Sequence, residues 1–410
     1  MPVKRFPIDA TAEQIRSLSP PAPTEAVSEI LRDVRSRGDA AVIALERRFG
    51  GYEGGEIRPV SSGFLQDSLG GLDARLRAAL ELAIANVEAV AGEQRARDYS
   101  VTLPQGQSIA YRNMPVRRAA AYIPGGRGSY PSTAVMCLAT ARVAGVESIC
   151  AVSPVREHGD VDRGVAAVCA MLGVEELYPI GGAQAIGALA YGTQTIEAVD
   201  VIVGPGNSYV QEAKRQVVGT VGIDGVAGPS ELVVVAGADC DPAAIALDLL
   251  AQAEHGPDSL VVLISPEPDV LDAVIAEVGE IGAEMAAVLA ADLQAAVELA
   301  DRIAPEHMQI STDGETASAL AASVRNAGCV FVGHNGATAF GDYVAGSNHV
   351  LPTGGAARFA SALSVATFTR RMSEVTIPDA AVGALADAGA AIADAEGFPL
   401  HGRSMEVRNQ

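Results

Sequence analysis

The sequence predicts an α/β protein with two doubly wound, Rossmann-like domains, a helical N-terminal region and a C-terminal arm. Its 410 residues exceed what one hydrophobic core usually serves, so two main domains and an appendage are expected. Hydrophobic residues make up 49% of the chain and aromatic residues only 4%, which predicts cores of small aliphatic side chains, as in α/β proteins. From about residue 111, short apolar runs alternate with helical stretches, which is the pattern of βα units in a parallel sheet.

Residues 1–110 are predicted to form a helical region that packs with the second α/β domain. Ranges 24–49 and 76–98 carry apolar residues at the helical period and charges on the opposite face, with Gly-rich breaks between them. This pattern is typical of scaffold rather than of a site.

The first α/β domain is expected over residues 111–230. Its predicted strands each end in Gly or Pro and lead into a helix: 119–123, 147–152, 176–180 and 199–203. Glycine-rich turns 181–187 and 204–208 follow the last two strands, where backbone N–H groups and the helix dipole can accept a pyrophosphate. Residues 122–126 and 227–231 form two more loops of this kind. No turn completes G-x-G-x-x-G, so they predict a nicotinamide dinucleotide site while purely structural turns stay open.

The second α/β domain is expected over residues 231–365 and the C-terminal arm over 366–410. A second series of apolar runs predicts the strands of this domain: 232–236, 259–264, 287–290, 308–311 and 329–332. The arm is predicted to be an alanine-rich helix that ends in a polar segment from Glu396 to His401. Because that ending resembles a set of ligands, we expect the arm to be swapped onto the partner subunit of a homodimer.

The composition bears on the partners of the chain. Acidic residues outnumber basic ones 50 to 29, and a net charge of −21 disfavours nucleic acid and anionic membranes as partners. No apolar run approaches the roughly 18 residues of a membrane span, so a soluble, cytoplasmic protein is expected. Five scattered cysteines predict buried thiols rather than disulfides or a thiolate zinc site. Lysine occurs only at Lys4 and Lys214, which excludes a P-loop and argues against most Schiff-base chemistry.

The Glu–His dipeptides at 254–255 and 306–307 contain two of the six histidines. Gln252 and His255 lie near the end of a predicted helix stopped by a Gly-Pro dipeptide, so both side chains would leave one face and could bind one metal ion. Imidazole suits zinc, whereas an amide oxygen is a weak ligand that needs harder partners. The alternative is an ordinary helix end in which His255 caps carbonyl groups and Gln252 faces solvent.

Two further segments carry candidate chemistry. Asp342 and His349 lie in the loop 341–352, where Asp342 could be a third metal ligand; the alternative is an Asx-turn with His349 satisfied by the backbone. Glu306 and His307 follow a proline and are expected in a loop at one edge of the second sheet. Such a pair can remove a hydroxyl proton and activate water, as oxidation at an alcohol carbon requires, although a structural role fits the pattern equally well.

Taken together, these segments resemble the histidinol dehydrogenase family, zinc enzymes of histidine biosynthesis that oxidise L-histidinol to L-histidine with two NAD molecules. The resemblance runs from about Tyr122 to Pro352, extends more sparsely to His401 and is weak in the first hundred residues. Its most specific stretches are Gly-Pro-Ser-Glu at 228–231 and Gln-Ala-Glu-His-Gly-Pro-Asp at 252–258.

The resemblance implies a role for each matching residue. It implies one zinc ion per subunit and four zinc ligands, with His401 supplied by the partner subunit: Gln252, His255, Asp342 and His401. It implies Glu306 and His307 as the catalytic pair. The NAD contacts that it implies are Tyr122, Gln184 and Asn207. The substrate contacts that it implies are Ser230, Gln252, His255, His307, Asp342, Glu396 and His401.

Two other functions stay open at this point. One is the oxidation of another small polar alcohol, such as a sulfonated diol, with the same metal and cofactor. Thr338 leaves the substrate open, because many family members have a glutamate at this position. The presence of Glu396 argues against this alternative. The other is a zinc hydrolase or a silent metal-binding relative, and the absence of H-E-x-x-H argues against the hydrolase.

Overall fold

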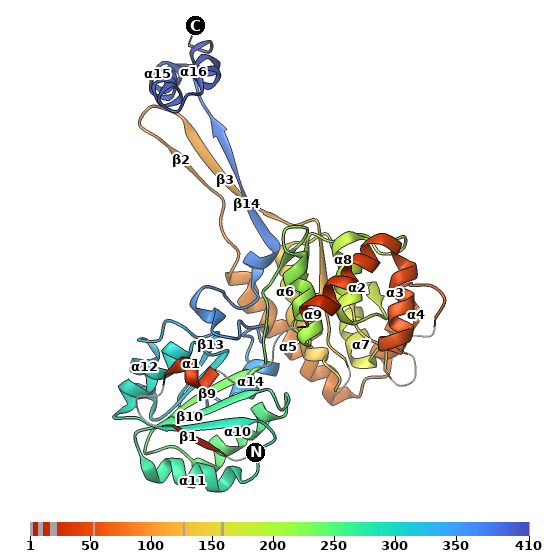
Figure 1. The fold of residues 1–410 in the computed structure, drawn as a ribbon, viewed down its shortest axis with the longest axis vertical. Coiled ribbons are helices and arrows are strands. Elements are labelled where there is room, and N and C mark those ends of the chain that lie inside the picture. The colour runs from red at the N-terminus through yellow and green to blue at the C-terminus, as the bar shows by residue number, and fades with distance from the viewer. Residues whose placement is uncertain are drawn as a thin grey trace. The chain divides into compact units, whose positions relative to one another are not determined.

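The computed structural model describes residues 3–6, 11–16, 23–51, 54–125, 128–156 and 160–409. The chain divides into two compact units. The first comprises residues 1–94 and 117–368 and contains two parallel sheets; the second comprises 95–116 and 369–410 and contains an antiparallel sheet with two helices (Figure 1).

The first sheet of unit 1 is a five-stranded parallel sheet in the order β6-β5-β4-β7-β8. Its strands are β4 (Arg118–Tyr122), β5 (Ser148–Val152), β6 (Glu176–Tyr178), β7 (Val201–Val203) and β8 (Gly222–Ile223). Its helices are α6 (Pro131–Ala144), α7 (Arg163–Leu172), α8 (Gly182–Tyr191) and α9 (Ser208–Val217). The order reverses between β4 and β7, and such a switch point is where doubly wound sheets bind ligands at the carboxyl ends of their strands.

The second sheet repeats this topology in the order β1-β11-β10-β9-β12-β13, again with parallel pairs. Its strands are β1 (Lys4–Phe6), β9 (Glu231–Ala236), β10 (Leu260–Ser265), β11 (Glu284–Leu289), β12 (His307–Ser311) and β13 (Cys329–Val332). Its helices are α1 (Ala12–Arg16), α10 (Pro242–Ala253), α11 (Pro268–Val278), α12 (Leu293–Ile303), α13 (Gly314–Ala321) and α14 (Thr338–Tyr343). Two 3-10 turns follow, η2 (Ala356–Arg358) and η3 (Val365–Phe368). The predicted α/β class with parallel sheets is confirmed.

The central strands are apolar on both faces because helices cover both faces of the sheet. In β9, Val233 and Val235 pack toward α12 and α13, whereas Leu232 and Val234 pack toward α10 and α11. A strand buried on both sides appears in the sequence as a continuous apolar run rather than an alternating one. This explains why the apolar runs locate these strands to within a few residues.

The N-terminal region differs from the expectation that it would pack with the second α/β domain. β1 pairs with β11 and α1 packs against α12 in that domain, and Asn86 of α5 donates to the Val344 carbonyl there at 2.8 Å. The other helices pack on the first domain, α2 on α8 and α9, α3 on α8, α4 on α7, and α5 on α6. Their bounds are α2 (Thr24–Arg37), α3 (Asp39–Leu45), the π-helix η1 (Glu46–Gly50), α4 (Ser62–Gly70) and α5 (Ala74–Glu93). The single helix expected over 24–49 is broken at Gly38, whose φ of 57° is left-handed.

The second unit is an antiparallel sheet in the order β14-β3-β2, followed by two helices that pack on each other. Its elements are β2 (Tyr99–Thr102), β3 (Ser108–Pro115), β14 (Thr369–Thr376), α15 (Asp379–Ala395) and α16 (Pro399–Glu406). All eight residues of β14 pair with β3, from Thr369 opposite Pro115 to Thr376 opposite Ser108. The compact unit therefore contains the arm predicted over 366–410 together with the hairpin of β2 and β3, because strand pairing joins segments far apart in sequence.

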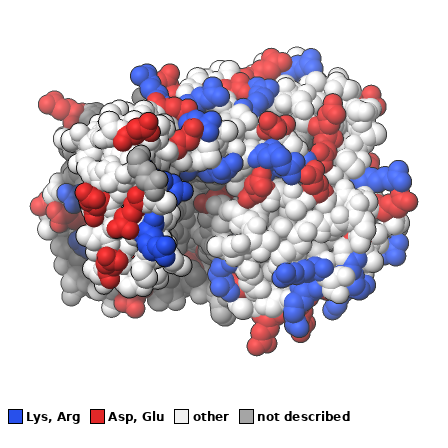
Figure 2. Space-filling view, turned by 90° about the horizontal axis from the view of Figure 1, so that it is seen from above, with Lys and Arg blue, Asp and Glu red and all other residues white. Residues whose placement is uncertain are grey.

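Two observations concern the membrane and nucleic-acid partners that the net charge disfavours. No helix in the part of the chain that the structure describes has the length and apolar character to cross a membrane. On the face in Figure 2, Lys and Arg side chains are interspersed with Asp and Glu, and the described residues form no continuous basic surface there.

Gly204 tests the packing of the first switch point. Its φ is 112°, and a Cβ at this residue would lie 2.2 Å from the carbonyl oxygen of Tyr122. We expect Gly204→Ala to lower the free energy of unfolding by roughly 2–5 kcal/mol, because a left-handed backbone and an overpacked contact both disfavour the alanine. The matched control is Gly173→Ala, where φ is 72° and no described atom would lie within 4 Å, so only about 1–2 kcal/mol is expected. Equal losses for both variants in urea unfolding would contradict the close approach at Gly204.

Candidate active site

The predicted catalytic residues gather at the amino edge of the second sheet. Glu231 and His307 are the first residues of the adjacent strands β9 and β12, and Ser230 and Glu306 directly precede them. His307 is the first residue of the strand rather than part of a loop as expected. This edge is opposite to the one at which a doubly wound sheet usually binds its ligand.

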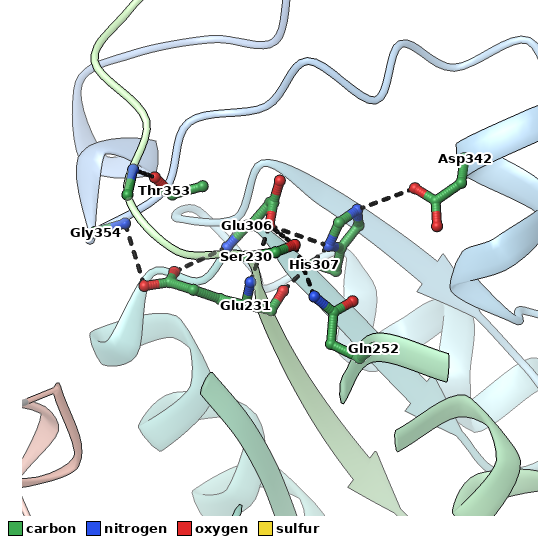
Figure 3. A network of polar contacts seen from close by, with 9 residues as sticks. Ser230, Glu231, Gln252, Glu306, His307, Asp342, Thr353 and Gly354 are labelled. Carbon is green, nitrogen blue, oxygen red and sulfur yellow. Dashed lines mark hydrogen bonds and ion pairs between the residues drawn. The ribbon is translucent and has the colours of Figure 1, made fainter. Parts of the chain in front are cut away.

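Glu306 is held by donors at the start of β9 (Figure 3). Its Oε2 accepts the Ser230 hydroxyl at 2.5 Å and the Glu231 N–H at 2.9 Å. Both bonds use the same oxygen, and Oε1 accepts no hydrogen bond from any residue that the structure describes. The carboxylate is buried, yet one of its oxygens keeps its lone pairs for another molecule.

His307 is oriented by its ring nitrogen Nδ1. This atom lies 3.1 Å from the carbonyl oxygen of Glu231, which can only accept, so Nδ1 carries the proton in the neutral ring. Nε2 then holds the lone pair and points toward Asp342, whose Oδ1 lies 3.7 Å away (Figure 3). The arrangement presents a basic nitrogen to the space beside Asp342.

The amide of Gln252 is oriented by the same network. Ser230 uses its only proton for Glu306, so its oxygen must accept from Gln252 Nε2, which lies 2.7 Å away. The Gln252 Oε1 is consequently directed to the side on which Asp342 lies (Figure 3). Gln252 is buried in the last turn of α10, so the solvent-facing alternative for it is wrong.

Asp342 reaches the cluster because α14 packs closely on β13. A Cβ on Gly341 would lie 2.5 Å from the ring of Phe331, so the helix can approach only with glycine there. The ring of Phe331 in turn lies 6.0 Å from that of His307, measured between centroids. Asp342 belongs to this short helix, not to the loop or Asx-turn that its sequence suggested.

His349 connects Asp342 to the first domain. Its Nδ1 lies 2.7 Å from the carbonyl oxygen of Asp342 and must donate, so Nε2 accepts from the Thr133 hydroxyl of α6, 3.2 Å away. Burial lowers the pKa of the His349 imidazole, mainly through desolvation of its charged form. The structural reading of His349 is therefore correct, and the contact fixes the backbone that carries Asp342.

Glu231 is a residue of this cluster to which the sequence analysis gave no role. It is buried; its Oε2 accepts the Glu306 N–H at 3.2 Å, and its Oε1 accepts the Gly354 N–H at 3.1 Å. It thus ties β9 to β12 and to the segment after residue 350 (Figure 3). The signal that could have shown it is a carboxylate at the head of an otherwise apolar strand.

The remaining predicted metal ligands are placed less compactly. His255 is exposed and lies two residues beyond the end of α10 at Ala253, in a further turn in which its N–H donates to the Gln252 carbonyl at 3.3 Å. In the described ranges, no three His, Cys, Asp or Glu side chains gather as a metal-binding group. The predicted set has only two such residues in unit 1, His255 and Asp342, and the neighbouring helices α10 and α14 bring the Gln252 amide oxygen toward Asp342. An imidazole, a carboxylate and an amide oxygen form a donor set that fits zinc, with the carboxylate as the harder ligand.

Glu396 and His401 belong to the second unit. Glu396 follows α15 as its C-cap, and His401 lies in α16 with its ring edge-on to Phe398 at 5.4 Å between centroids. Their assignment to the site stays a prediction.

The predicted cofactor contacts lie at the carboxyl edge of the first sheet. The buried Tyr122 ends β4, and its oxygen accepts the Gly182 N–H at 3.0 Å. Desolvation raises the pKa of the Tyr122 hydroxyl to about 12, so it stays protonated and can still donate. Glu46 Oε1 accepts the Gly181 N–H and the Gln184 Nε2, both at 2.8 Å. The N–H groups of turn 181–187 at Gly181 and Gly182 therefore have protein acceptors and are not free for a pyrophosphate.

In the second glycine-rich turn, residues 204–207 also make hydrogen bonds to other residues of the protein. The Gly204 N–H donates to Asp224 at 2.7 Å, and Asn207 Oδ1 caps α9 by accepting from Tyr209 and Val210, both at 3.1 Å. The amide nitrogen of Asn207 donates to no residue that the structure describes. Gly126, in the loop after β4, lies outside the described residues.

The pH dependence of the free energy of unfolding tests the contact between Glu46 and the turn 181–187. It is fully buried, its Oε2 has no partner in the described residues, and desolvation raises the pKa of its carboxyl above 4.5. A raised folded-state pKa contributes stability that is fully present below the unfolded pKa and is lost as the pH rises through the folded pKa. Glu46→Gln cannot ionise, so it should gain stability relative to wild type between about pH 5 and pH 8. Urea unfolding at both pH values measures this, with the exposed Glu298→Gln as control; a pH-independent difference would contradict it.

Three comparisons with known proteins agree. A family model described as histidinol dehydrogenase matches residues 16–409. Histidinol dehydrogenase 1 of Nostoc sp. is 40% identical over 398 residues, covering 94% of this chain and 91% of that protein. The histidinol dehydrogenase of Agrobacterium fabrum is 42% identical over 397 residues, covering 93% and 91%. The crystal structure of histidinol dehydrogenase from Elizabethkingia anophelis has a TM-score of 0.91 at 28% identity and covers 99% of this chain and 98% of that one. The chain belongs to the histidinol dehydrogenase family, oxidoreductases of histidine biosynthesis.

Proposed function

We propose that this chain oxidises L-histidinol through the aldehyde to L-histidine, a four-electron reaction that reduces two NAD molecules at a zinc-holding site. The observation that carries the proposal is that one network orients two atoms for which the described residues supply no hydrogen-bond donor. Nε2 of His307 is available as a base, and Oε1 of Glu306 is available as a second acceptor. One group can serve the alcohol and the other the water that the second oxidation needs.

The side chains that would hold the two absent groups lie at different sheet edges. Gln252, His255 and Asp342, with His401 of the partner subunit, would hold zinc, which orients the amino alcohol when bound. Tyr122, Gln184 and Asn207 would contact NAD, which accepts the hydride. Each of these three keeps a donor or acceptor that no described residue engages, which supports the assignment.

His307 acts in both oxidations. Its Nε2 takes the hydroxyl proton of the alcohol while the C–H bond breaks and its electron pair leaves as hydride, which gives the aldehyde. The carbonyl oxygen of Glu231 holds the Nδ1 proton and stabilises the imidazolium that forms. After losing that proton to solvent, the same nitrogen can deprotonate the hydrated aldehyde for the second hydride transfer.

Glu306 acts between the two oxidations. Its Oε1 removes a proton from water, the resulting hydroxide adds to the aldehyde carbon, and the carbonyl oxygen takes a proton to give the diol. Loss of the second hydride and two protons from the diol yields the carboxylate. Because Ser230 and Glu231 both bind Oε2, the carboxylate can do this without losing its orientation.

A homodimer with shared sites follows from the same proposal. Unit 2 presents large apolar side chains that are mostly exposed: Ile392 is 61% exposed, Phe398 54% and Leu400 74%. Such a concentration of exposed apolar residues marks an interaction surface. It lies beside Glu396 and His401, so the surface that would dock on a second copy also carries the two predicted ligands.

Glu306→Gln separates the two half-reactions. A glutamine can still accept from Ser230 and Glu231 but cannot take a proton from water. We expect oxidation of the alcohol to fall less than about 10-fold and oxidation of the aldehyde by roughly 10²–10⁴-fold. The measurement is NADH formed per histidinol, which should be two for wild type and approach one for the variant when a hydrazine traps the aldehyde. Glu298→Gln is the control, and equal loss of both steps would contradict the division of roles.

Subunit complementation tests whether His401 serves its partner. The homodimers of His307→Asn and of His401→Ala should both be inactive. In mixed dimers one site would combine the intact His307 of one chain with the intact His401 of the other. Random reassociation of equal amounts should therefore restore about a quarter of wild-type activity. A mixture no more active than the separate variants would show that His401 acts within its own chain or not at all.

A further inference from the structure

Two buried polar side chains on α9 take no part in the proposed reaction. Gln211 is 4% exposed and Lys214 is 1% exposed, and they lie three residues apart on one face of the helix. A buried lysine is rare unless it is paired, so its position needs a physical reason. Each side chain bonds to the turn that follows β7. Each also bonds to the linker that leads from the first sheet to β9 of the second sheet.

Lys214 and Asp224 together hold the peptide groups of Gly204. The Lys214 ammonium donates to the Gly204 carbonyl at 2.9 Å and forms an ion pair with Asp224, whose side chain is 5% exposed. The other oxygen of Asp224 accepts the Gly204 N–H at 2.7 Å. The glycine that starts the turn is thus bonded to this ion pair through both its N–H and its C=O.

Gln211 makes a second connection between the same segments. Its Oε1 accepts the Ala227 N–H at 2.8 Å, and its Nε2 lies 3.5 Å from the Gly206 carbonyl, a long hydrogen bond. Gly206 belongs to the turn 204–207, and Ala227 belongs to the linker 224–230. The side chains at 211 and 214 therefore each connect the turn to the linker.

The linker ends in the catalytic cluster. After Ala227, the Gly228 N–H donates to Thr353, and two residues later Ser230 binds Glu306 at 2.5 Å. A displacement of the linker would move Ser230 and the first residue of β9. A displacement of the turn would move Asn207, the predicted NAD contact.

We propose that Gln211 and Lys214 are positioning residues that fix the cofactor turn 204–207 against the linker 224–230. This sets the distance between the nicotinamide and the Ser230–Glu306 cluster. The inference rests on the proposed function, because it takes Asn207 in that turn as a contact of NAD. The physical reason is that hydride transfer depends steeply on placement, and a misplacement of about 1 Å can cost roughly 100-fold in rate.

Two variants remove one connection each with little change in size. Gln211→Leu removes the neutral connection. Lys214→Met with Asp224→Asn removes the ion pair without leaving one charge buried alone, and the new amide oxygen can still accept from the Gly204 N–H. We expect each to lower kcat/KM for NAD by roughly 10–100-fold, while KM for histidinol stays within about twofold. NADH fluorescence titration should show weaker binding, and it is undisturbed because the chain has no tryptophan.

The control breaks the ion pair of a buried arginine with a partly exposed glutamate at the opposite edge of the same sheet. Arg118 is 2% exposed and donates to Glu176 at 2.7 and 3.0 Å at the amino end of β4. Arg118→Met should lower the melting temperature as much as the α9 variants do, but it should leave kcat/KM for NAD unchanged.

The outcomes separate the inference from the function on which it rests. Folded α9 variants with wild-type kcat/KM for NAD would overturn the inference alone. The same loss in Arg118→Met would also overturn it, because general destabilisation would then explain the effect. If the double variant does not fold, Gln211→Leu decides. A wild-type enzyme that forms no NADH from histidinol would remove the proposed function and this inference with it.

Discussion

Two glutamates at the amino edge of the second sheet hold each other's backbone, and the candidate site depends on this reciprocal contact. Glu306 accepts the Glu231 N–H at 2.9 Å, and Glu231 accepts the Glu306 N–H at 3.2 Å. Buried carboxylates are costly unless they accept hydrogen bonds, and here backbone donors at the starts of adjacent strands supply them. The Glu231 carbonyl then sets the tautomer of His307. The base and the water-activating carboxylate are therefore both oriented by the main chain of β9.

The two sheets use opposite edges for their polar chemistry. In the first sheet, Tyr122 and Asn207 lie at the carboxyl edge, beside the reversal of strand order. In the second sheet, aspartate side chains at the carboxyl edge cap the N-termini of α10, α12 and α13 by accepting hydrogen bonds from backbone N–H groups there. That edge presents carboxylates where a doubly wound sheet usually presents free N–H groups. The catalytic groups lie at the other end of the strands, and the linker after β8 joins the two edges.

Much of the fold could be predicted from local pattern. The apolar runs predict the strands of both sheets except the short edge strands β1 and β8, because helices on both faces make the inner strands continuous apolar runs. The N-terminal helices were located by their period but assigned to the second domain, because an apolar stripe does not say which surface will cover it. Asp342 was expected in a loop because its neighbours include glycine, whereas Gly341 allows a helix to approach Phe331. Glu46 and Glu231 were missed, because a glutamate in a sequence does not show the backbone N–H groups that will surround it.

By itself, the sequence determined the inner strands of the two parallel sheets and most of the helices between them, the absence of a P-loop lysine and the residue types from which the site is built. These follow from periodicity, from glycine and proline breaks and from composition, which act over a few residues. Only the tertiary structure decided which oxygen of Glu306 and which nitrogen of His307 are free to react. Those choices depend on donors and acceptors supplied by β9, and β9 and β12 are adjacent only once the sheet has formed.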